Sequence, residues 1–313
     1  MDITGAREWP EHNKNRALAQ RMNKNRPQIA CEITARAVVA ARARAQGHGL
    51  ETYTSKSLPE GAVTPDLTEA NVLRGGSLRE AIKTALEEVG GRGRDVVTII
   101  PDAAVRVVLL DFETLPEKRE EAEAVVRFRL KKSLPFDVDK ARLSYQVQPG
   151  GSGKGLQVIA AVALASVLDE YEAAFRESGY VPGVVLPSML AALGAVDAAR
   201  PTLVVKVDPF TISIAILEKQ QLLLFRTLEN SRGLTITGEQ LAEDVYPSVV
   251  FFQDTYKLDV ERVFVAGLPN SELALQSLRA QTGVEVEELA GAEPSGATGS
   301  GSQLAGVTGA LLS

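Results

Sequence analysis

The 313-residue sequence has one cysteine, two histidines and no long apolar run. A single cysteine, Cys31, excludes an internal disulfide and suits a reducing compartment. His12 lies in a polar N-terminal stretch and His48 in an expected turn, so with Cys31 they form no recognisable zinc-binding set. The mostly apolar run Val158–Leu168 is far shorter than the roughly 18 residues of a membrane-spanning helix. We therefore expect any membrane role to be indirect.

The sequence also lacks a basic excess and the common catalytic motifs. Its formal net charge is −6, whereas a nucleic-acid-binding protein normally presents a basic face. The N-terminus has no apolar signal-peptide region, and neither a serine-hydrolase elbow nor a metalloprotease motif occurs. The glycine-rich segment 150–155 precedes an expected strand and lacks the spacing of a phosphate-binding loop. These absences argue against nucleic-acid binding and leave no recognisable catalytic set.

What is present is the composition of a globular protein, with 45% hydrophobic and 24% charged residues. Two segments differ. Segment 1–26 is polar and becomes basic in its second half; we predict a disordered tail, with a short basic helix that touches anionic lipid or an acidic partner as the alternative. Segment 291–303 is rich in glycine, serine and alanine and is predicted to be a flexible linker.

The same pattern of three short strands begins the chain twice. The first set covers 29–58 and turns near Thr34 and Ala35, and the second consists of Leu203–Val207, Ile212–Leu217 and Leu222–Leu228. Helices are expected after each set, including a mostly apolar one over 186–199 and another over 239–256. This repetition predicts a two-lobed α/β protein with internally similar lobes.

Between the two sets lies the stretch Asp95–Val147, which reads as strand, strand, amphipathic helix and strand. Thr114 and Glu117 have the spacing of a capping box at the start of that helix. Acidic side chains precede basic ones along it, as the helix dipole favours, and Pro135 ends it. We interpret the stretch as a small α+β module inserted into the first lobe.

Taken together, these features resemble the PilM family of type IV pilus assembly proteins, within the actin/FtsA-like superfamily. The resemblance is carried by Val96–Leu110, Leu134-Pro135-Phe136 with Asp139, Leu203–Leu217, Leu223–Thr227, Arg262–Gly267 and Ala305–Leu312. It implies an α/β, actin-like two-lobed fold in which each lobe is a mixed sheet with helices. It also implies an FtsA-like inserted subdomain of the 1C type and a reduced subdomain 2B.

The implied boundaries follow the same resemblance. The first lobe would cover 27–200, with 96–177 as the inserted subdomain. The second lobe would cover 201–313, with 239–259 as the reduced 2B region. Leu134, Pro135, Phe136 and Asp139 would be structural residues of the family motif, with Pro135 ending a helix and turning the chain.

The resemblance implies a nucleotide site between the lobes, but its motifs are degenerate here. Actin-like proteins wrap phosphates with glycine-containing hairpins, because the backbone must approach the phosphates closely. Where the family has Asp/Glu-Ile-Gly and Asp-Ile-Gly, this chain has Glu32-Ile33-Thr34 and Asp208-Pro209-Phe210. The family's adenine-side Gly-Gly corresponds to Ala266-Gly267. The degenerate nucleotide-binding residues are thus Glu32, Thr34, Asp208 and Gly267.

Two interpretations of the acids Glu32 and Asp208 stay open. They could ligate metal or water in a residual Mg·ATP site, or they could be solvated turn acids with no cofactor. The lost glycines favour the second interpretation. We therefore expect no catalytic residue, no metal ligand and no ATP turnover.

The function that the resemblance implies is a cytoplasmic scaffold of the type IV pilus inner-membrane platform. Its expected partner is the cytosolic tail of a PilN-like membrane protein, extended in a groove between the first lobe and the inserted subdomain. That partner would hold the chain at the inner membrane, and the pilus motor ATPases are a further expected partner. The alternatives are an active actin-like Mg·ATPase and the cytoplasmic part of a type II secretion platform protein, which normally carries a membrane span after these lobes.

Overall fold

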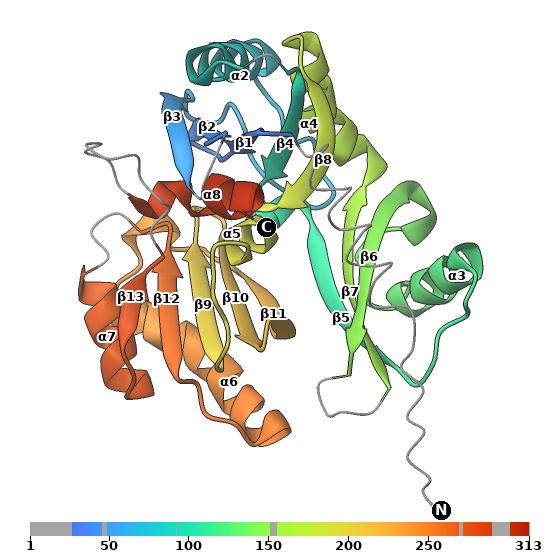
Figure 1. Ribbon diagram of the computed structural model, residues 1–313, viewed down its shortest axis with the longest axis vertical. Coiled ribbons are helices and arrows are strands. Elements are labelled where there is room, and N and C mark those ends of the chain that lie inside the picture. Colours follow the sequence, from blue (N-terminus) through green and yellow to red (C-terminus); the bar gives the residue numbers. More distant parts are fainter. Residues whose placement is uncertain are drawn as a thin grey trace, which may run out of the picture.

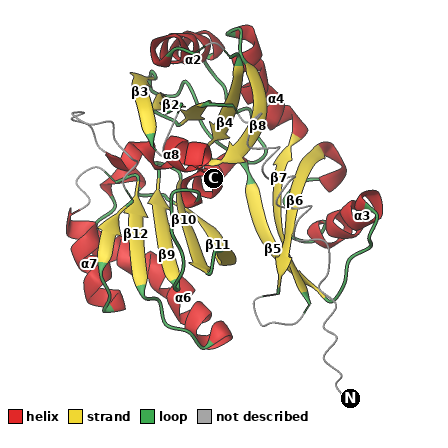
Figure 2. Cartoon of the chain, in the orientation of Figure 1, coloured by secondary structure: helices red, strands yellow, loops and turns green. Residues whose placement is uncertain are grey.

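The computed structural model describes residues 27–45, 49–91, 93–150, 155–268, 272–289 and 301–312. Its strands form two sheets of five strands and one of three. Figures 1 and 2 show the two larger sheets in separate lobes, with the small sheet beside them. The predicted α/β class is confirmed, and the predicted tail 1–26 lies outside the described residues.

The first lobe is built on a sheet of strand order β3-β2-β1-β4-β8. Strands β1 to β3 pair antiparallel, whereas β4 pairs parallel with both β1 and β8. The central strands of a sheet covered on both faces are mostly apolar, and β1, with the sequence IACEI, is buried along its whole length, Glu32 included. The strand bounds are β1 Ile29–Ile33, β2 Ala37–Ala43, β3 Leu50–Ser57, β4 Asp95–Ile100 and β8 Val181–Pro187.

Helices cover both faces of this first sheet. Successive side chains of a strand point to opposite faces, so Cys31 packs into a cluster with α2 and α4 whereas Ala30 packs into another with α8. The helices are α2 Gly75–Val89, α4 Ala165–Glu177, α5 Ser188–Leu193 and α8 Ala305–Leu312. Because α8 packs on the first sheet, the second lobe ends before it, which corrects the predicted range 201–313. The helix predicted over 186–199 is also corrected, since β8 and the short α5 occupy most of it.

The second lobe repeats the start of the first. Its strand order is β11-β10-β9-β12-β13. Strands β9 to β11 pair antiparallel and β12 pairs parallel with β9, just as β1 to β3 and β4 do in the first sheet. The bounds are β9 Thr202–Val207, β10 Thr211–Glu218, β11 Gln221–Glu229, η3 Gly233–Thr235, α6 Gly238–Tyr256, β12 Arg262–Ala266, α7 Glu272–Thr282 and β13 Val286–Glu288. The repetition that the sequence predicted is therefore confirmed.

Helix α6 occupies most of the region predicted to be a reduced subdomain, 239–259. It begins with a capping box of Thr237 and Gln240, and it buries Leu241, Val245 and Phe252 in the core of the second lobe. The connection between β11 and β12 thus contributes one lobe helix.

The small sheet has the order β5-β7-β6 and is antiparallel. Its bounds are η1 Asp102–Ala104, β5 Arg106–Phe112, α3 Arg119–Leu130, η2 Val138–Lys140, β6 Ala141–Pro149 and β7 Leu156–Leu164. Helix α3 covers one face, where Val126 and Leu130 pack against Val158 and Val162. The helix begins at Arg119 after Lys118, without a side-chain cap, so the capping box predicted at Thr114 is wrong.

The inserted subdomain is narrower than the predicted range 96–177. Strand β4 belongs to the first sheet, and α4 packs into the core of the first lobe through Tyr171 and Phe175. The insertion therefore lies between η1 and the end of β7. Its far end reaches the second lobe, where β5 lies beside β11.

The last segment of the predicted linker, 301–303, forms part of a 3-10 helix, η4 Gly301–Leu304. The remainder of that linker, 291–300, lies outside the described residues. The η4 turn leads directly into α8.

Candidate functional site

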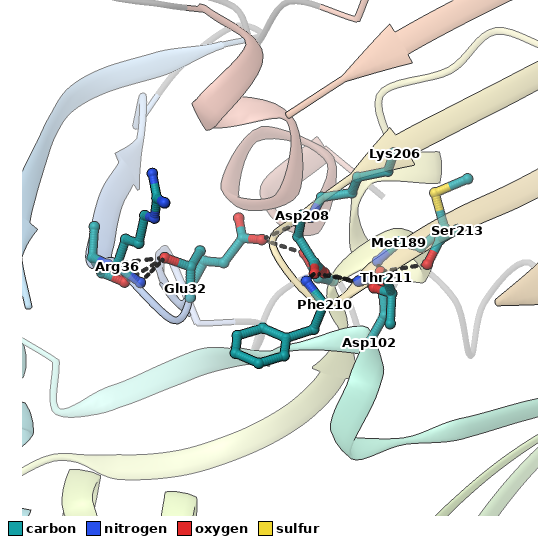
Figure 3. Close-up of polar contacts among 12 residues, drawn as sticks. Glu32, Arg36, Asp102, Met189, Lys206, Asp208, Phe210, Thr211 and Ser213 are labelled. Carbon is teal, nitrogen blue, oxygen red and sulfur yellow. Dashed lines mark hydrogen bonds and ion pairs between the residues drawn. The ribbon is translucent and has the colours of Figure 1, made fainter. Parts of the chain in front are cut away.

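The carboxyl ends of β1 and β9 meet between the lobes and line a cavity of about 140 Å³. The four residues predicted for a degenerate nucleotide site, Glu32, Thr34, Asp208 and Gly267, all line it. Figure 3 shows the cluster of polar side chains around Glu32 and Asp208. The sequence therefore predicted which residues come together, although they lie far apart along the chain.

We refer to this cavity as the cleft. The turn that follows β1 at its edge is held by hydrogen bonds between its own residues. The Thr34 hydroxyl oxygen accepts hydrogen bonds from the backbone N–H groups of Arg36, at 3.2 Å, and Ala37, at 2.9 Å. Backbone N–H groups of such a turn are the donors that a phosphate would use. In this chain a side chain of the same turn already takes them.

The turn that follows β9 is also held by hydrogen bonds within itself, here to the carboxylate of Asp208. Asp208 Oδ1 accepts from the N–H groups of Phe210, at 2.7 Å, and Thr211, at 2.8 Å, and its Oδ2 accepts from the Thr211 hydroxyl at 2.8 Å. Pro209 has no N–H to offer. Asp208 is thus the internal cap of its own hairpin, a role that Asp side chains commonly take in turns.

Gly267 follows β12 at a point where the chain passes very close to β9. Its φ is +87°, and a Cβ there would lie 2.0 Å from the Val207 carbonyl oxygen. Glycine is required at this position by backbone geometry and close approach alone. Its presence therefore does not by itself indicate a nucleotide.

A buried ion pair crosses the cleft. Lys206 Nζ on β9 lies 3.6 Å from Glu32 Oε1 on β1, and the two side chains are 10% and 3% exposed. Ser188, the first residue of α5, donates a hydrogen bond to the same Glu32 oxygen. On the other side Glu32 abuts α8, where a Cβ on Gly306 would lie 2.2 Å from Glu32 Oε2. Glu32 is therefore contacted from three elements, β9, α5 and α8.

A second buried carboxylate, Asp102, lies at the junction between β4 and the inserted subdomain. Its Oδ1 accepts from the Met189 N–H at 2.8 Å, and its Oδ2 accepts from the Ser213 hydroxyl of β10 at 3.0 Å. Burial raises the pKa of Asp102 to about 6, although the nearby Lys206 favours the charged form. The Asp102–Ser213 hydrogen bond is a second polar link between the lobes.

Lys206 is the cation of this cluster. Burial lowers its pKa, but the neighbouring carboxylates, led by Glu32 and Asp102, raise it, and the net pKa lies above the ordinary lysine value. The ammonium group is therefore charged at neutral pH. In the described part of the chain, no three His, Cys, Asp or Glu side chains converge in a way that could hold a metal ion.

These observations test whether the residues of the cleft fit Mg·ATP, the ligand that the resemblance to actin-like proteins implies. Small-molecule sites usually measure at least about 300 Å³, whereas this cavity is about 140 Å³. The turn donors are taken, and a lysine already supplies the positive charge between the lobes. The residues as they lie do not fit a metal-bound triphosphate.

Sequence reasoning missed Lys206 and Asp102. The available signals were a lysine inside the otherwise apolar strand TLVVKV and an acid two residues after the buried strand β4. Neither signal says what the side chain pairs with, because the partners come from the opposite lobe or from α5.

The family-motif residues lie elsewhere, at the end of α3. Leu134 and Phe136 pack against the core of the small sheet. Helix α3 ends at Leu130, five residues before Pro135, so the prediction that Pro135 ends the helix is wrong. Asp139, in η2, pairs with Lys131 across 3.4 Å. All four residues lie away from the cleft.

A second cavity, of about 110 Å³, lies where the inserted subdomain meets the first lobe. Its walls are the start of β6, the end of β7 and the end of β8, closed by Ile100, Val105 and Leu168. The lining is mainly apolar. Arg142, the one charged lining residue, pairs with Glu172 at 2.9 Å and also with Asp169. We refer to this cavity as the groove.

No helix within the described residues has the length and apolar character needed to cross a membrane. No protein-family model matches the sequence. A search of curated proteins likewise finds no match.

Solved structures do match the fold. A chain of the PilM–PilN type IV pilus biogenesis complex aligns over 91% of this protein and 98% of its own length, with a TM-score of 0.74 and 22% identity. The cytoplasmic domain of EpsL, an inner-membrane component of the type II secretion system of Vibrio cholerae, aligns over 77% and 83%, with a TM-score of 0.50 and 10% identity. The chain thus has the two-lobed actin-like fold with an inserted small sheet, in the arrangement found in the PilM–PilN complex.

Proposed function

We propose that the chain is a cytoplasmic scaffold of a type IV pilus inner-membrane platform, held at the membrane by the tail of a PilN-like protein. The observation that carries this proposal is the alignment with a chain of the PilM–PilN complex over 98% of that chain. Its partner, the PilN-like tail, is expected to bind as an extended peptide. The pilus motor ATPases remain a predicted further partner, to which we assign no surface.

The groove between the first lobe and the inserted subdomain is the binding site that we propose for the tail. It runs between β8, the edge strand of the first sheet, and β6, an edge strand of the small sheet. Edge strands offer backbone groups to an extended peptide, while pockets beside them select its side chains. On β8, Val181 and Val184 are 51% and 39% exposed, so this edge strand also carries exposed apolar side chains outside the cavity.

The test is a titration of the purified full chain with a synthetic peptide of the PilN-like protein's N-terminal cytosolic tail. Ser144 is an exposed residue that lines the groove, so Ser144→Trp should fill the groove without disturbing the core. Ser144→Ala is the matched control. We expect binding by wild type and Ser144→Ala and at least tenfold weaker binding by Ser144→Trp. No binding by wild type at hundreds of micromolar would contradict the proposal.

We also propose that the scaffold works without ATP turnover. The bonded turns, the small cleft and the resident Lys206 support this proposal. Phosphate release from Mg·ATP by the purified chain is the direct test, and steady turnover would contradict the proposal.

A role in a type II secretion platform is the second candidate, because the EpsL cytoplasmic domain also aligns. The higher TM-score and coverage of the PilM–PilN chain favour the pilus. A peptide from a type II platform partner, titrated in parallel, would separate the two candidates.

A further inference from the structure

The groove and the cleft share a wall. Pro187 lines the groove, and the next residue, Ser188, donates its hydroxyl hydrogen to Glu32 in the cleft. Met189 then donates its backbone N–H to Asp102 at 2.8 Å. The end of β8 is therefore anchored by the cleft on one side and forms the groove on the other.

A second covalent path joins the same two sites. Ile100, at the end of β4, lines the groove, and Asp102 follows two residues later. Asp102 accepts the Ser213 hydroxyl hydrogen at 3.0 Å, and Ser213 belongs to the second lobe. The end of β4 thus leads to Asp102, which bonds to the second lobe, and the end of β8 leads to Glu32, which pairs with Lys206 of the second lobe.

The side chains that make these links are shielded from bulk solvent. Glu32, Asp102, Lys206 and Ser213 are all buried. Removing one member of a buried ion pair leaves its partner charged and unpaired, which costs far more than loss of an exposed pair. Removing only one charge of the Glu32–Lys206 pair should therefore disturb the contact between the lobes more than removing both.

We propose that Lys206 is a resident cation that latches the lobes in place of a metal-bound nucleotide, and that this latch sets the affinity of the groove for its peptide. We call the Glu32–Lys206 pair with the Ser188 hydroxyl the latch. The affinity part of the inference rests on the proposed function. Loss of the Lys206 charge releases Glu32, and with it Ser188 and the end of β8, so the groove loses its fixed wall. Because coupling between two sites is reciprocal, peptide in the groove must in turn stabilise the latch.

The experiment compares wild type with Lys206→Met, Glu32→Gln and the double variant Glu32→Gln/Lys206→Met. The double variant removes both charges of the Glu32–Lys206 pair together, so it remains interpretable if a single variant, with one charge of the pair left unpaired, fails to fold. Lys83→Met, on the exposed face of α2, removes the same charge outside the cleft and is the control. Two quantities are measured: peptide affinity, and hydrogen exchange of the Met189 amide and the β8 amides without peptide.

We expect Lys206→Met and the double variant to bind the peptide at least about fivefold more weakly than wild type, the lower end of typical coupling. We also expect faster exchange at Met189 and in β8, and no change in Lys83→Met. Exchange that stays as in wild type in both Lys206 variants would overturn the latch. Faster exchange with unchanged peptide affinity would overturn the coupling.

Failure of the proposed function is a different result. If wild type binds no peptide, the groove assignment falls and the coupling falls with it. The exchange measurement, which uses no peptide, still decides whether Lys206 latches the lobes.

Discussion

The side chain of Gln148 bonds to both backbone groups of Leu222, as a neighbouring strand would. Gln148 Nε2 donates to the Leu222 carbonyl at 2.6 Å, and Gln148 Oε1 accepts from the Leu222 N–H at 3.3 Å. Gln148 lies in β6, and Leu222 lies in β11, the edge strand of the second sheet. An exposed sheet edge is a template for unwanted pairing, so this amide covers part of that edge while joining the inserted subdomain to the second lobe.

Gln148→Leu should therefore destabilise the protein by about 1–3 kcal/mol, because it leaves a buried N–H and a buried carbonyl without partners. Urea unfolding measures the change in the free energy of unfolding. Gln146→Leu, at an exposed site two residues earlier on β6, is the control and should have little effect. Equal stability of the two variants would mean that the Gln148 contact contributes nothing.

Asp102 should make stability depend on pH. Its folded-state pKa is about 6, above the ordinary value of 3.8, so between these values the folded state binds the proton more tightly than the unfolded chain. This group's contribution to stability is full below about pH 4 and is lost as pH rises through about 6. A difference of about two pH units corresponds to about 3 kcal/mol.

Asp102→Asn keeps acceptor and donor atoms near Met189 and Ser213 but does not titrate. Between about pH 4 and pH 7, wild type should lose about 3 kcal/mol more unfolding free energy than the variant. Urea unfolding of both proteins at each pH gives a difference in which the contributions of the other carboxyl groups cancel. One such group is Asp66, whose pKa is lowered by backbone hydrogen bonds. Lys206 and Asp208 also face this group, and both are present in the two proteins. Parallel stability curves would contradict the prediction.

The cap of the second cleft turn is expected to serve folding. Asp208→Ala removes the acceptor for Phe210, Thr211 and the Thr211 hydroxyl and should cost about 2 kcal/mol of stability. Asp208→Asn retains one carbonyl acceptor and should cost less. Thermal unfolding measures both. A loss of Mg·ATP affinity in Asp208→Ala, without loss of stability, would instead support a nucleotide role.

Gly306 should tolerate no side chain. A Cβ there would meet Glu32 Oε2 at 2.2 Å, so Gly306→Ala must push Glu32 away from Lys206 or shift α8, at an expected cost of about 1–3 kcal/mol. Gly76→Ala, in α2, meets nothing within 4 Å. It is the matched control and should be neutral or stabilising by up to about 1 kcal/mol. Equal effects of the two substitutions would show that the contact at Gly306 is easily relieved.

The apolar pattern of the sequence predicted those strands whose side chains are buried in a regular way. The strands around Ile29 and Leu203 alternate or run apolar, and their pairing in both lobes follows from that pattern. Strand β8 was missed because Pro182 and Gly183 interrupt its apolar pattern and three of its seven residues are exposed. Such a strand forms only because the neighbouring β4 supplies a parallel partner.

The cleft was predicted only in its outline. The motif comparison located Glu32 and Asp208, but the ion pair with Lys206 depends on how the lobes pack. A single strand sequence contains no information about a charge on the opposite lobe. Helix α8 was assigned to the wrong lobe for the same reason. Its small residues could pack on either sheet, and only the structure shows that they contact Ala30 and Val39 of the first.

The position of α8 has a consequence for synthesis of the chain. The first sheet needs residues 305–312 to cover one of its apolar faces, whereas one face of the second sheet is covered by residues between 203 and 286. On the ribosome, the first sheet therefore waits with one face uncovered while α6 and α7 can already cover a face of the second sheet. We expect the first lobe to be completed only after α8 has emerged, and the nascent chain to need protection of that sheet face until then.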